Sequence, residues 1–125
     1  MKKQGVQQLK KKADKWCSDY IRQRDKGVCF TCGCKKEWKY QQAGHYISRV
    51  YGNLRYYEKN VHCQCYSCNV MKHGNMDEYA IRLQQKYGKD ILEELNKYKY
   101  MPPTPFKVAD LLDLIEEFKI KIKKL

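Results

Sequence analysis

Two Cys-x-x-Cys pairs are the residues whose type and spacing most directly indicate chemistry in this chain. Cys29 and Cys32 enclose two residues and precede a glycine, and Cys65 and Cys68 enclose two residues further along. Thiolates at this spacing can converge on one ion, and two such pairs are typical of a tetrahedral four-cysteine zinc site. Because four thiolates close the coordination shell, we expect this Zn2+ to stabilise the fold without taking part in catalysis.

Three further cysteines leave alternatives open. Cys63-x-Cys65 is also a plausible chelate, but only Cys65 completes a two-residue spacer with Cys68, so Cys65 is preferred. Cys17, Cys34 and Cys63 are then structural or spare thiols whose roles stay undecided. In a reducing compartment, seven cysteines favour metal binding over disulfides.

The stretch from Ala43 to His73 concentrates the other candidate groups. It holds all three histidines of the chain, His45, His62 and His73, together with Asn60 and Asn69. A neutral histidine can take a proton from water, and amide oxygens suit hard divalent cations. We expect this stretch to fold as two short strands and a helix that hold a divalent metal against DNA.

The charge of the chain supports a polyanionic partner. The 26 basic and 14 acidic side chains give +12, distributed as +6 in residues 1–28, +5 in residues 29–73 and +1 in residues 74–125. DNA or RNA is the commonest partner of such a surface, and solubility alone is the alternative explanation. An anionic membrane is disfavoured because Asp14, Asp19 and Asp25 interrupt the N-terminal lysines.

The elements that must position these groups follow from periodicity. We expect a single domain, residues 1–125, in three parts: a basic N-terminal helix (1–27), a zinc-clamped core (28–74) and C-terminal helices (75–125). Apolar residues at helical spacing predict the first helix over 6–25. The sequence contains neither a membrane-spanning apolar run nor a signal-peptide pattern, so we expect a cytoplasmic protein with no membrane partner.

Within the core, short apolar runs predict strands over 44–48 and 61–64, joined by a long loop over 49–60. A helix is expected over 65–73. Three C-terminal helices are predicted from about residue 75 to 87, 90 to 99 and 107 to the end. The first of these begins with a capping-box pattern, Asn75 with Glu78 three places on.

This order of elements, with His45, Asn60 and Asn69 between two cysteine pairs, resembles the HNH nuclease module and its ββα-metal site. The chain is similar, more specifically, to the phage NinG (Rap) recombination nuclease family. The resemblance extends over nearly the whole chain and rests on SDYIRQRD, CFTCG, AGHYISR, LRYYEKNVHCQCYSCN, HGN, EYAIRL and a final helix ending in KIKKL. It implies an α+β fold with a small zinc-stabilised, treble-clef-like HNH core and flanking helices.

The resemblance also implies roles for individual residues. His45 would be the general base, and Asn60 would orient its imidazole or hold the loop against it. Asn69 stands where the third HNH residue binds the catalytic Mg2+ or Mn2+. His73 lies four residues beyond Asn69, on the same face of the predicted helix, and is a candidate second ligand.

The chain departs from the common HNH pattern at Gly44, where many of these enzymes carry a metal-binding side chain before the base. The NinG pattern itself has Gly-His at this point. We therefore expect another ligand, Glu58 or a backbone oxygen. The residues expected to hold DNA phosphates, rather than to be solvated charges, are Arg49, Arg55 and Lys72. The tyrosines that either pack or stack on unpaired bases are Tyr51, Tyr56 and Tyr57.

The function implied by the resemblance is metal-dependent endonucleolytic hydrolysis of phosphodiester bonds in branched DNA, such as Holliday junctions or D-loops, during phage recombination. The location would then be the cytoplasm of the bacterial host. A non-catalytic zinc-dependent DNA-binding module and an HNH nuclease of general or restriction type are the alternatives. Symmetric incision of a junction would need two active sites, which makes a homodimer compatible with this function.

Overall fold

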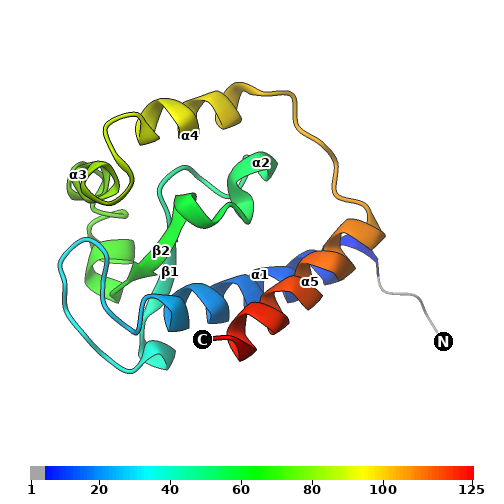
Figure 1. The fold of residues 1–125 in the computed structure, drawn as a ribbon, viewed down its shortest axis with the longest axis horizontal. Coiled ribbons are helices and arrows are strands. Elements are labelled where there is room, and N and C mark those ends of the chain that lie inside the picture. Colours follow the sequence, from blue (N-terminus) through cyan, green and yellow to red (C-terminus); the bar gives the residue numbers. More distant parts are fainter. Residues whose placement is uncertain (1–4) are drawn as a thin grey trace.

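A computed structural model describes residues 5–125 as helices and short turns arranged around a two-stranded antiparallel sheet (Figure 1). The fold is of the α+β class, as predicted. The first four residues of the expected basic N-terminal segment lie outside the described part. The elements are α1 (Val6–Arg24), η1 (Trp38–Tyr40), β1 (Gln42–His45), α2 (Gly52–Arg55), η2 (Glu58–Asn60), β2 (Val61–Gln64), η3 (Ser67–Met71), α3 (Met76–Tyr87), α4 (Ile91–Tyr100) and α5 (Val108–Lys123).

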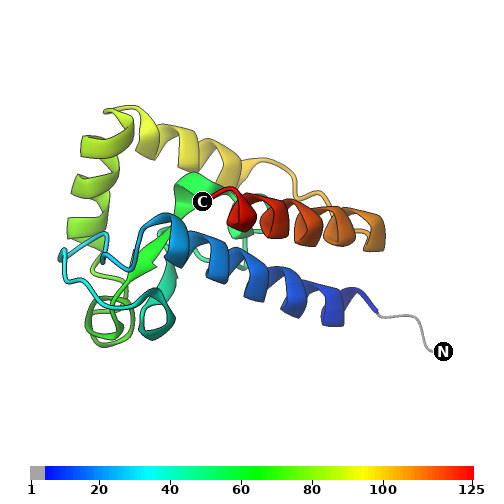
Figure 2. The same ribbon diagram turned by 60° about the horizontal axis from the view of Figure 1, so that its bottom comes forward.

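The first and last helices of the fold pack against each other. Figures 1 and 2 show α1 and α5 side by side and running in the same direction. Their buried apolar stripes include Leu9, Ala13 and Ile21 of α1 and Leu111 and Ile115 of α5. Burying a leucine or isoleucine side chain contributes about 1.5–3 kcal/mol, so this contact fixes α1 as a firm wall beside the sheet.

The sheet pairs β1 with β2 in a register that sets Gly44 opposite His62 and His45 opposite Val61. The predicted bounds of the second strand are confirmed, but those of the first are wrong, because β1 begins at Gln42 and ends at His45. The ladder ends early because the N–H and the carbonyl of Ile47, which a longer strand would use for pairing, are both hydrogen-bonded to the side chain of Asn60.

A second core lies between the loop after β1 and the helices α3 and α4. Its buried members are Ile47, Leu54, Tyr79, Leu83, Ile91 and Leu95. The predicted loop over 49–60 contains two short turns, α2 and η2, that bury Leu54 and Asn60. Short helical turns are difficult to predict because tertiary packing rather than periodicity stabilises them.

Two helix predictions need correction. The helix expected over 65–73 is a five-residue π-helical turn, η3, which ends at Met71. At the start of α3, Asn75 is left-handed, with φ of 51°, and makes no capping hydrogen bond. Its amide lies 3.6 Å from Cys68 Sγ instead, so the capping-box prediction for Asn75 and Glu78 is wrong.

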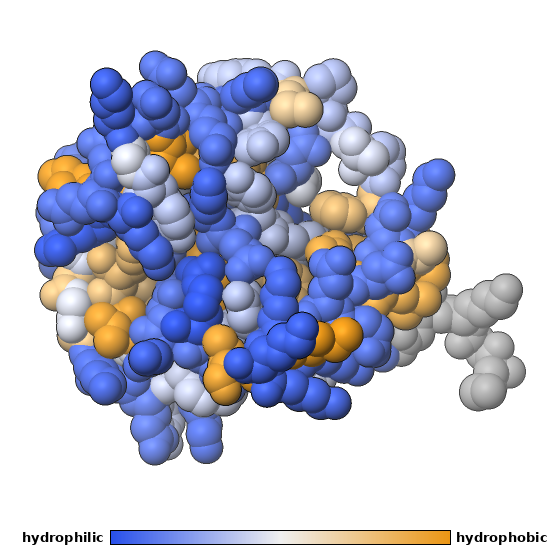
Figure 3. All heavy atoms as spheres, in the orientation of Figure 1, coloured by the Kyte–Doolittle hydropathy of each residue, from blue (hydrophilic) through white to orange (hydrophobic). Residues whose placement is uncertain are grey.

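In the part of the chain from residue 5 to residue 125, no helix combines the length and the apolar character needed to cross a bilayer. The face of the molecule in Figure 3 is largely hydrophilic, with separate apolar patches between the charged side chains.

Candidate functional site

Four cysteines from two distant segments converge at one end of the fold. The sulfur atoms of Cys29, Cys32, Cys65 and Cys68 all lie within 4.8 Å of one another. The Sγ atoms of Cys32 and Cys65 are 3.7 Å apart, which is close to the edge of about 3.8 Å expected for a tetrahedron of thiolates at 2.3 Å from zinc. The four cysteines can therefore hold a metal ion such as zinc.

Backbone hydrogen bonds give the first cysteine pair its shape. Gly33 adopts φ of 80°, its N–H donates to the carbonyl of Cys29, and the N–H of Cys29 donates to the carbonyl of Cys34. Burial alone would raise the pKa of Cys29, but hydrogen bonds from Thr31 and from backbone N–H groups outweigh it and lower the pKa to about 6. This thiol is thus suited to act as a thiolate ligand.

The remaining cysteines lie outside this cluster. Cys63 is buried in β2, burial raises its pKa to about 12, and its N–H donates to Asp25. The choice of Cys65 over Cys63 as a ligand agrees with this geometry. Cys34 packs beside the cluster, whereas Cys17 is buried in α1.

A cleft of about 620 Å³ lies between α1 and the end of β1. The lining residues of α1 are Lys11, Asp14, Lys15, Cys17 and Ser18. The opposite wall is formed by Ala43, His45, Ser48, Arg49, Arg55, Tyr56, Val61 and Asn69. Four basic side chains and one carboxylate line the cleft, which therefore favours an anionic ligand.

His45 enters this cleft in a defined tautomer. Its Nε2 lies 2.9 Å from the carbonyl oxygen of Arg55. Because a carbonyl can only accept, Nε2 must carry the proton, and the neutral ring keeps a lone pair on Nδ1. Burial is the main cause that lowers the pKa of His45, so the imidazole is neutral at pH 7. No described residue bonds to Nδ1, which is left as a proton acceptor on a residue that lines the cleft.

Asn60 supports the loop that carries this carbonyl. It is completely buried, its Oδ1 accepts from the N–H of Ile47, and its Nδ2 donates to the carbonyls of Ile47 and Leu54. Leu54 directly precedes Arg55, the hydrogen-bond partner of His45. Of the two functions expected for Asn60, its contacts therefore match holding the loop, and none of them reaches the imidazole.

Asn69 lies in the same cleft wall, and its position explains the glycine before His45. Asn69 Nδ2 donates to Gln42 Oε1 at 2.7 Å, which leaves Oδ1 as an acceptor. A Cβ on Gly44 would collide with the side-chain oxygen of Gln64 and stand 3.0 Å from Asn69 Oδ1. A side chain at position 44 would therefore have to displace the amide of Gln64, which is buried and donates to Thr31 and to the Gly74 carbonyl.

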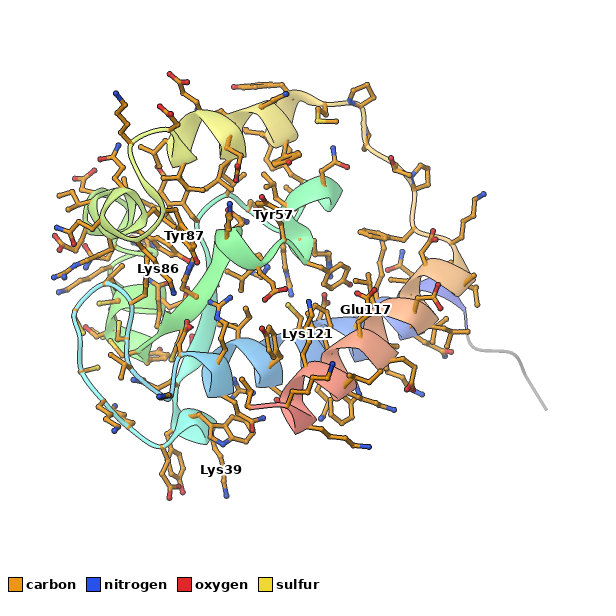
Figure 4. All side chains as sticks on the ribbon, viewed as in Figure 1. Lys39, Tyr57, Lys86, Tyr87, Glu117 and Lys121 are labelled. Atoms are coloured by element: carbon orange, nitrogen blue, oxygen red, sulfur yellow. The ribbon has the colours of Figure 1, made fainter. Side chains whose placement is uncertain are left out.

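Two of the expected metal ligands do not lie at the cleft. Glu58 accepts hydrogen bonds from Tyr20 and Lys121 on the side of α5, where Figure 4 shows Lys121 pointing into the molecule. His73 follows the end of η3 in a left-handed turn and is exposed. The expected i, i+4 relation between Asn69 and His73 fails because η3 is a π-helical turn that stops at Met71.

The three basic residues predicted to bind phosphate have different surroundings. Arg49 is exposed at the rim of the cleft. Arg55 also lines it, but its guanidinium forms a two-pronged ion pair with Asp14 at 2.9 and 2.6 Å. Lys72 is exposed after η3 and outside the cleft. Arg49 is thus the freest of the three for a ligand in the cleft.

The aromatic candidates mostly pack. The hydroxyls of Tyr56 and Tyr57 donate to the Lys10 carbonyl and to Glu94, and both rings contact neighbouring aromatic rings. His62 is buried between the hydroxyls of Tyr79 and Tyr87, and burial lowers its pKa to about 3. His62 is therefore a core residue.

Sequence reasoning missed two polar residues that hold side chains of the cleft, Asp14 in its lining and Gln42 behind Asn69. Asp14 pairs with Arg55, and Gln42 bonds to Asn69. The spacing of Lys11, Asp14 and Ser18 along one face of α1 is the signal that could have identified the wall. No local pattern indicates Gln42, since its partner lies 27 residues away.

Among the described residues 5–125, the four cysteines are the one group of His, Cys, Asp or Glu side chains whose ligand atoms converge closely enough to hold a metal. The fold and this site together define a small α+β protein with a four-cysteine cluster that can hold a metal ion.

Comparison with known proteins identifies the family. The family model described as "Bacteriophage Lambda NinG protein" matches residues 1–125, and the chain belongs to the NinG family. Over 89 residues it is 34% identical to the NinG proteins of Escherichia phage lambda and Salmonella phage P22. The match covers 68% of this chain and 42% of each of those two proteins, so the chain spans less than half the length of these relatives. No solved structure matches the chain.

Proposed function

We propose that the chain is a metal-dependent DNA endonuclease that acts on branched intermediates of phage recombination, with an HNH-like ββα-metal site in the basic cleft. The observation that carries the proposal is the environment of His45. This histidine is neutral, has its Nε2 tied to the Arg55 carbonyl and lines a cleft with Arg49, Lys11 and Lys15.

Phosphodiester hydrolysis needs a base for the attacking water and positive charge near the phosphate. Nδ1 of His45 would take the proton from water, since Nε2 already donates to a carbonyl. Arg49, Lys11 and Lys15 would bind the backbone phosphates on either side of the scissile bond. Asn60 acts through the loop: it positions the Arg55 carbonyl and hence the imidazole ring.

The donor set of the cleft fits Mg2+ or Mn2+ only in part. Asn69 offers an amide oxygen, and the described residues provide no group of three close ionisable ligands there. Mg2+ commonly binds through one or two protein ligands, with phosphate oxygens and waters completing its octahedron. Bound in this way, the ion would neutralise charge on the phosphate and stabilise the leaving oxygen.

The test is cleavage and binding of a labelled four-way junction, a fork and a linear duplex by wild type and His45→Ala. Wild type should cut in Mg2+ or Mn2+, and the variant should bind with unchanged affinity but lose at least ~100-fold in rate. The wild-type cleavage rate should rise with pH, because protonated His45 cannot act as a base. Since the pKa of His45 is lowered, the rate should already have reached its high-pH plateau by pH ~6.5. A fully active His45→Ala protein would refute the proposal.

One observation favours a second candidate, a zinc-dependent DNA-binding module without catalysis. The four-cysteine cluster is the preorganised metal group of the described residues, and Arg55 is neutralised by Asp14. In that case the same panel would give a shifted complex with every DNA and no cut product at any concentration of Mg2+ or Mn2+.

A further inference from the structure

Two short turns beside the cleft expose large apolar side chains. Tyr40 in η1 is 71% exposed, Met71 in η3 is 68% exposed, and Tyr66 before η3 is 54% exposed. None of the three side chains makes a hydrogen bond, an aromatic contact or a cation–π contact with a described residue. Two unpaired lysines flank them, Lys39 in η1 and Lys72 after η3. We call these five residues the η1–η3 surface.

Tyr40 lies in a turn whose backbone is held by several hydrogen bonds. The guanidinium of Arg22 donates to the carbonyls of Trp38, Lys39 and Gln41 at 3.3–3.4 Å, and it stacks on the ring of Trp38 at 5.0 Å. The amide of Gln41 donates to the carbonyls of Gly27 and Cys34 at 2.9 and 3.2 Å. Because the backbone is held at so many points, binding at Tyr40 would need to order only its side chain, which limits the entropic cost.

The second turn is anchored at the four-cysteine cluster. Two of the four clustered cysteines, Cys65 and Cys68, bracket Tyr66, and the N–H of Asn69 donates to the carbonyl of Cys65. Met71 follows two residues after Asn69. The turn is therefore fixed at its base while its apolar side chains face solvent.

One hydrogen bond joins the two turns next to the cleft. Gln42, two residues after Tyr40, accepts from Asn69, which lines the cleft with His45. In Figure 2 the two turns appear next to each other at the lower left, below the sheet. Figure 4 shows Lys39 at the edge of the molecule, pointing away from its body.

We propose that the η1–η3 surface binds unpaired or unstacked bases at a DNA branch, with Tyr40 and Met71 against the bases and Lys39 and Lys72 on the flanking phosphates. This inference rests on the proposal that the chain acts on DNA, and it names the element that selects branched DNA. Exposed aromatic and apolar side chains can stack on bases or insert between them, and the adjacent lysines match a polyanion.

The surface differs from the sequence-based candidates for stacking. Tyr56 and Tyr57 are held in aromatic clusters with their hydroxyls bonded, so they cannot reach a base without unfolding the loop. Tyr40 needs no rearrangement. Sequence patterns give no indication of Tyr40, because one exposed tyrosine in a short turn has no periodicity to distinguish it.

The experiment measures DNA binding by fluorescence anisotropy with zinc-loaded protein and without added Mg2+ or Mn2+. The ligands are a fork with unpaired bases at the branch and a linear duplex of equal length. Tyr40→Ala and Met71→Ala are compared with Tyr100→Ala, a matched control because Tyr100 is 78% exposed at the far end of α4. Lys39→Ala is compared with Lys89→Ala, another exposed lysine.

We expect Tyr40→Ala to weaken fork binding at least ~5-fold and duplex binding less than ~2-fold, since one stacked base is lost. Lys39→Ala should weaken both DNAs equally, and the Tyr100 and Lys89 controls should match wild type. The inference would be overturned if Tyr40→Ala bound the fork as tightly as Tyr100→Ala does. It would also be overturned if Tyr40→Ala lost the same factor in affinity for the fork and for the duplex. Because binding is read without cleavage, a protein that binds the fork but never cuts refutes the proposed nuclease and leaves this result standing.

Discussion

The sharpest structural prediction concerns Asn60→Ala. The side chain makes three hydrogen bonds, at 2.9, 2.9 and 3.2 Å, to backbone groups of Ile47 and Leu54, and it is completely buried. Truncation leaves the N–H and the carbonyl of Ile47 without partners in a site that water cannot reach, whereas the Leu54 carbonyl keeps the N–H of Tyr57 at 3.3 Å. Each buried unsatisfied group costs about 1–3 kcal/mol, so we expect a loss of about 3–5 kcal/mol in the free energy of unfolding.

The assay is urea and thermal unfolding of the zinc-loaded protein, followed by circular dichroism. For a domain of this size about 1 kcal/mol corresponds to roughly 3–5 °C, so Tm should fall by at least ~10 °C. Asn53→Ala is the matched control, because Asn53 also donates to three carbonyls, those of Tyr98, Met101 and Pro102, but at 3.2–3.4 Å and partly in solvent.

The control should lose less than about 1 kcal/mol, since water can replace its partners. If Asn60→Ala were no less stable than Asn53→Ala, the assignment of Asn60 as the residue that holds the loop would be refuted. Its place in an HNH-like pattern would then have to be explained by contact with the substrate.

Two further predictions concern the metal centre and the core. Cys68→Ser should lose the bound zinc and the cooperative unfolding transition, whereas Cys34→Ser should retain one zinc per chain by atomic absorption; equal zinc content in both variants would contradict the four-cysteine site. The pKa of His62 is about 3 in the folded protein and ~6.5 in the unfolded chain, so the folded state binds fewer protons between these values. The contribution of His62 to the free energy of unfolding is therefore complete above pH ~6.5 and falls by about 2 kcal/mol on going to pH 5. His62→Gln should remove that part of the pH dependence in denaturation experiments, and an unchanged slope would mean that other groups cause it.

The sequence was sufficient where a pattern repeats or a ligand type is distinctive. The helix bounds of α1 and α5 agree with prediction because their apolar stripes recur over four or more turns. The cysteine pairs were found because a two-residue spacer is itself a geometric constraint. The strand β2 was found because Val61 and Cys63 mark a short strand directly after Asn60.

Prediction failed where a distant partner decides the local structure. The bounds of β1 depend on Asn60, whose side chain substitutes for a strand at Ile47. The expected position of His73 depended on an α-helical repeat that the π-helical turn does not follow. Glu58 was a reasonable metal ligand by residue type, but it pairs with Lys121, which lies 63 positions further along the chain. Such contacts leave no trace in local periodicity.

The same long-range contacts connect the four-cysteine cluster to the cleft. Asn69 directly follows Cys68, and its amide bonds to Gln42 at the start of β1, the strand that ends at His45. The position of the Asn69 side chain relative to His45 is thus set through its neighbour Cys68 in the four-cysteine cluster and through one hydrogen bond. Gly44 must lack a side chain for these amides to occupy the space above β1. A small domain with a two-stranded sheet has few other contacts that fix Asn69 relative to His45, which is a physical reason for the four-cysteine cluster to lie next to the cleft.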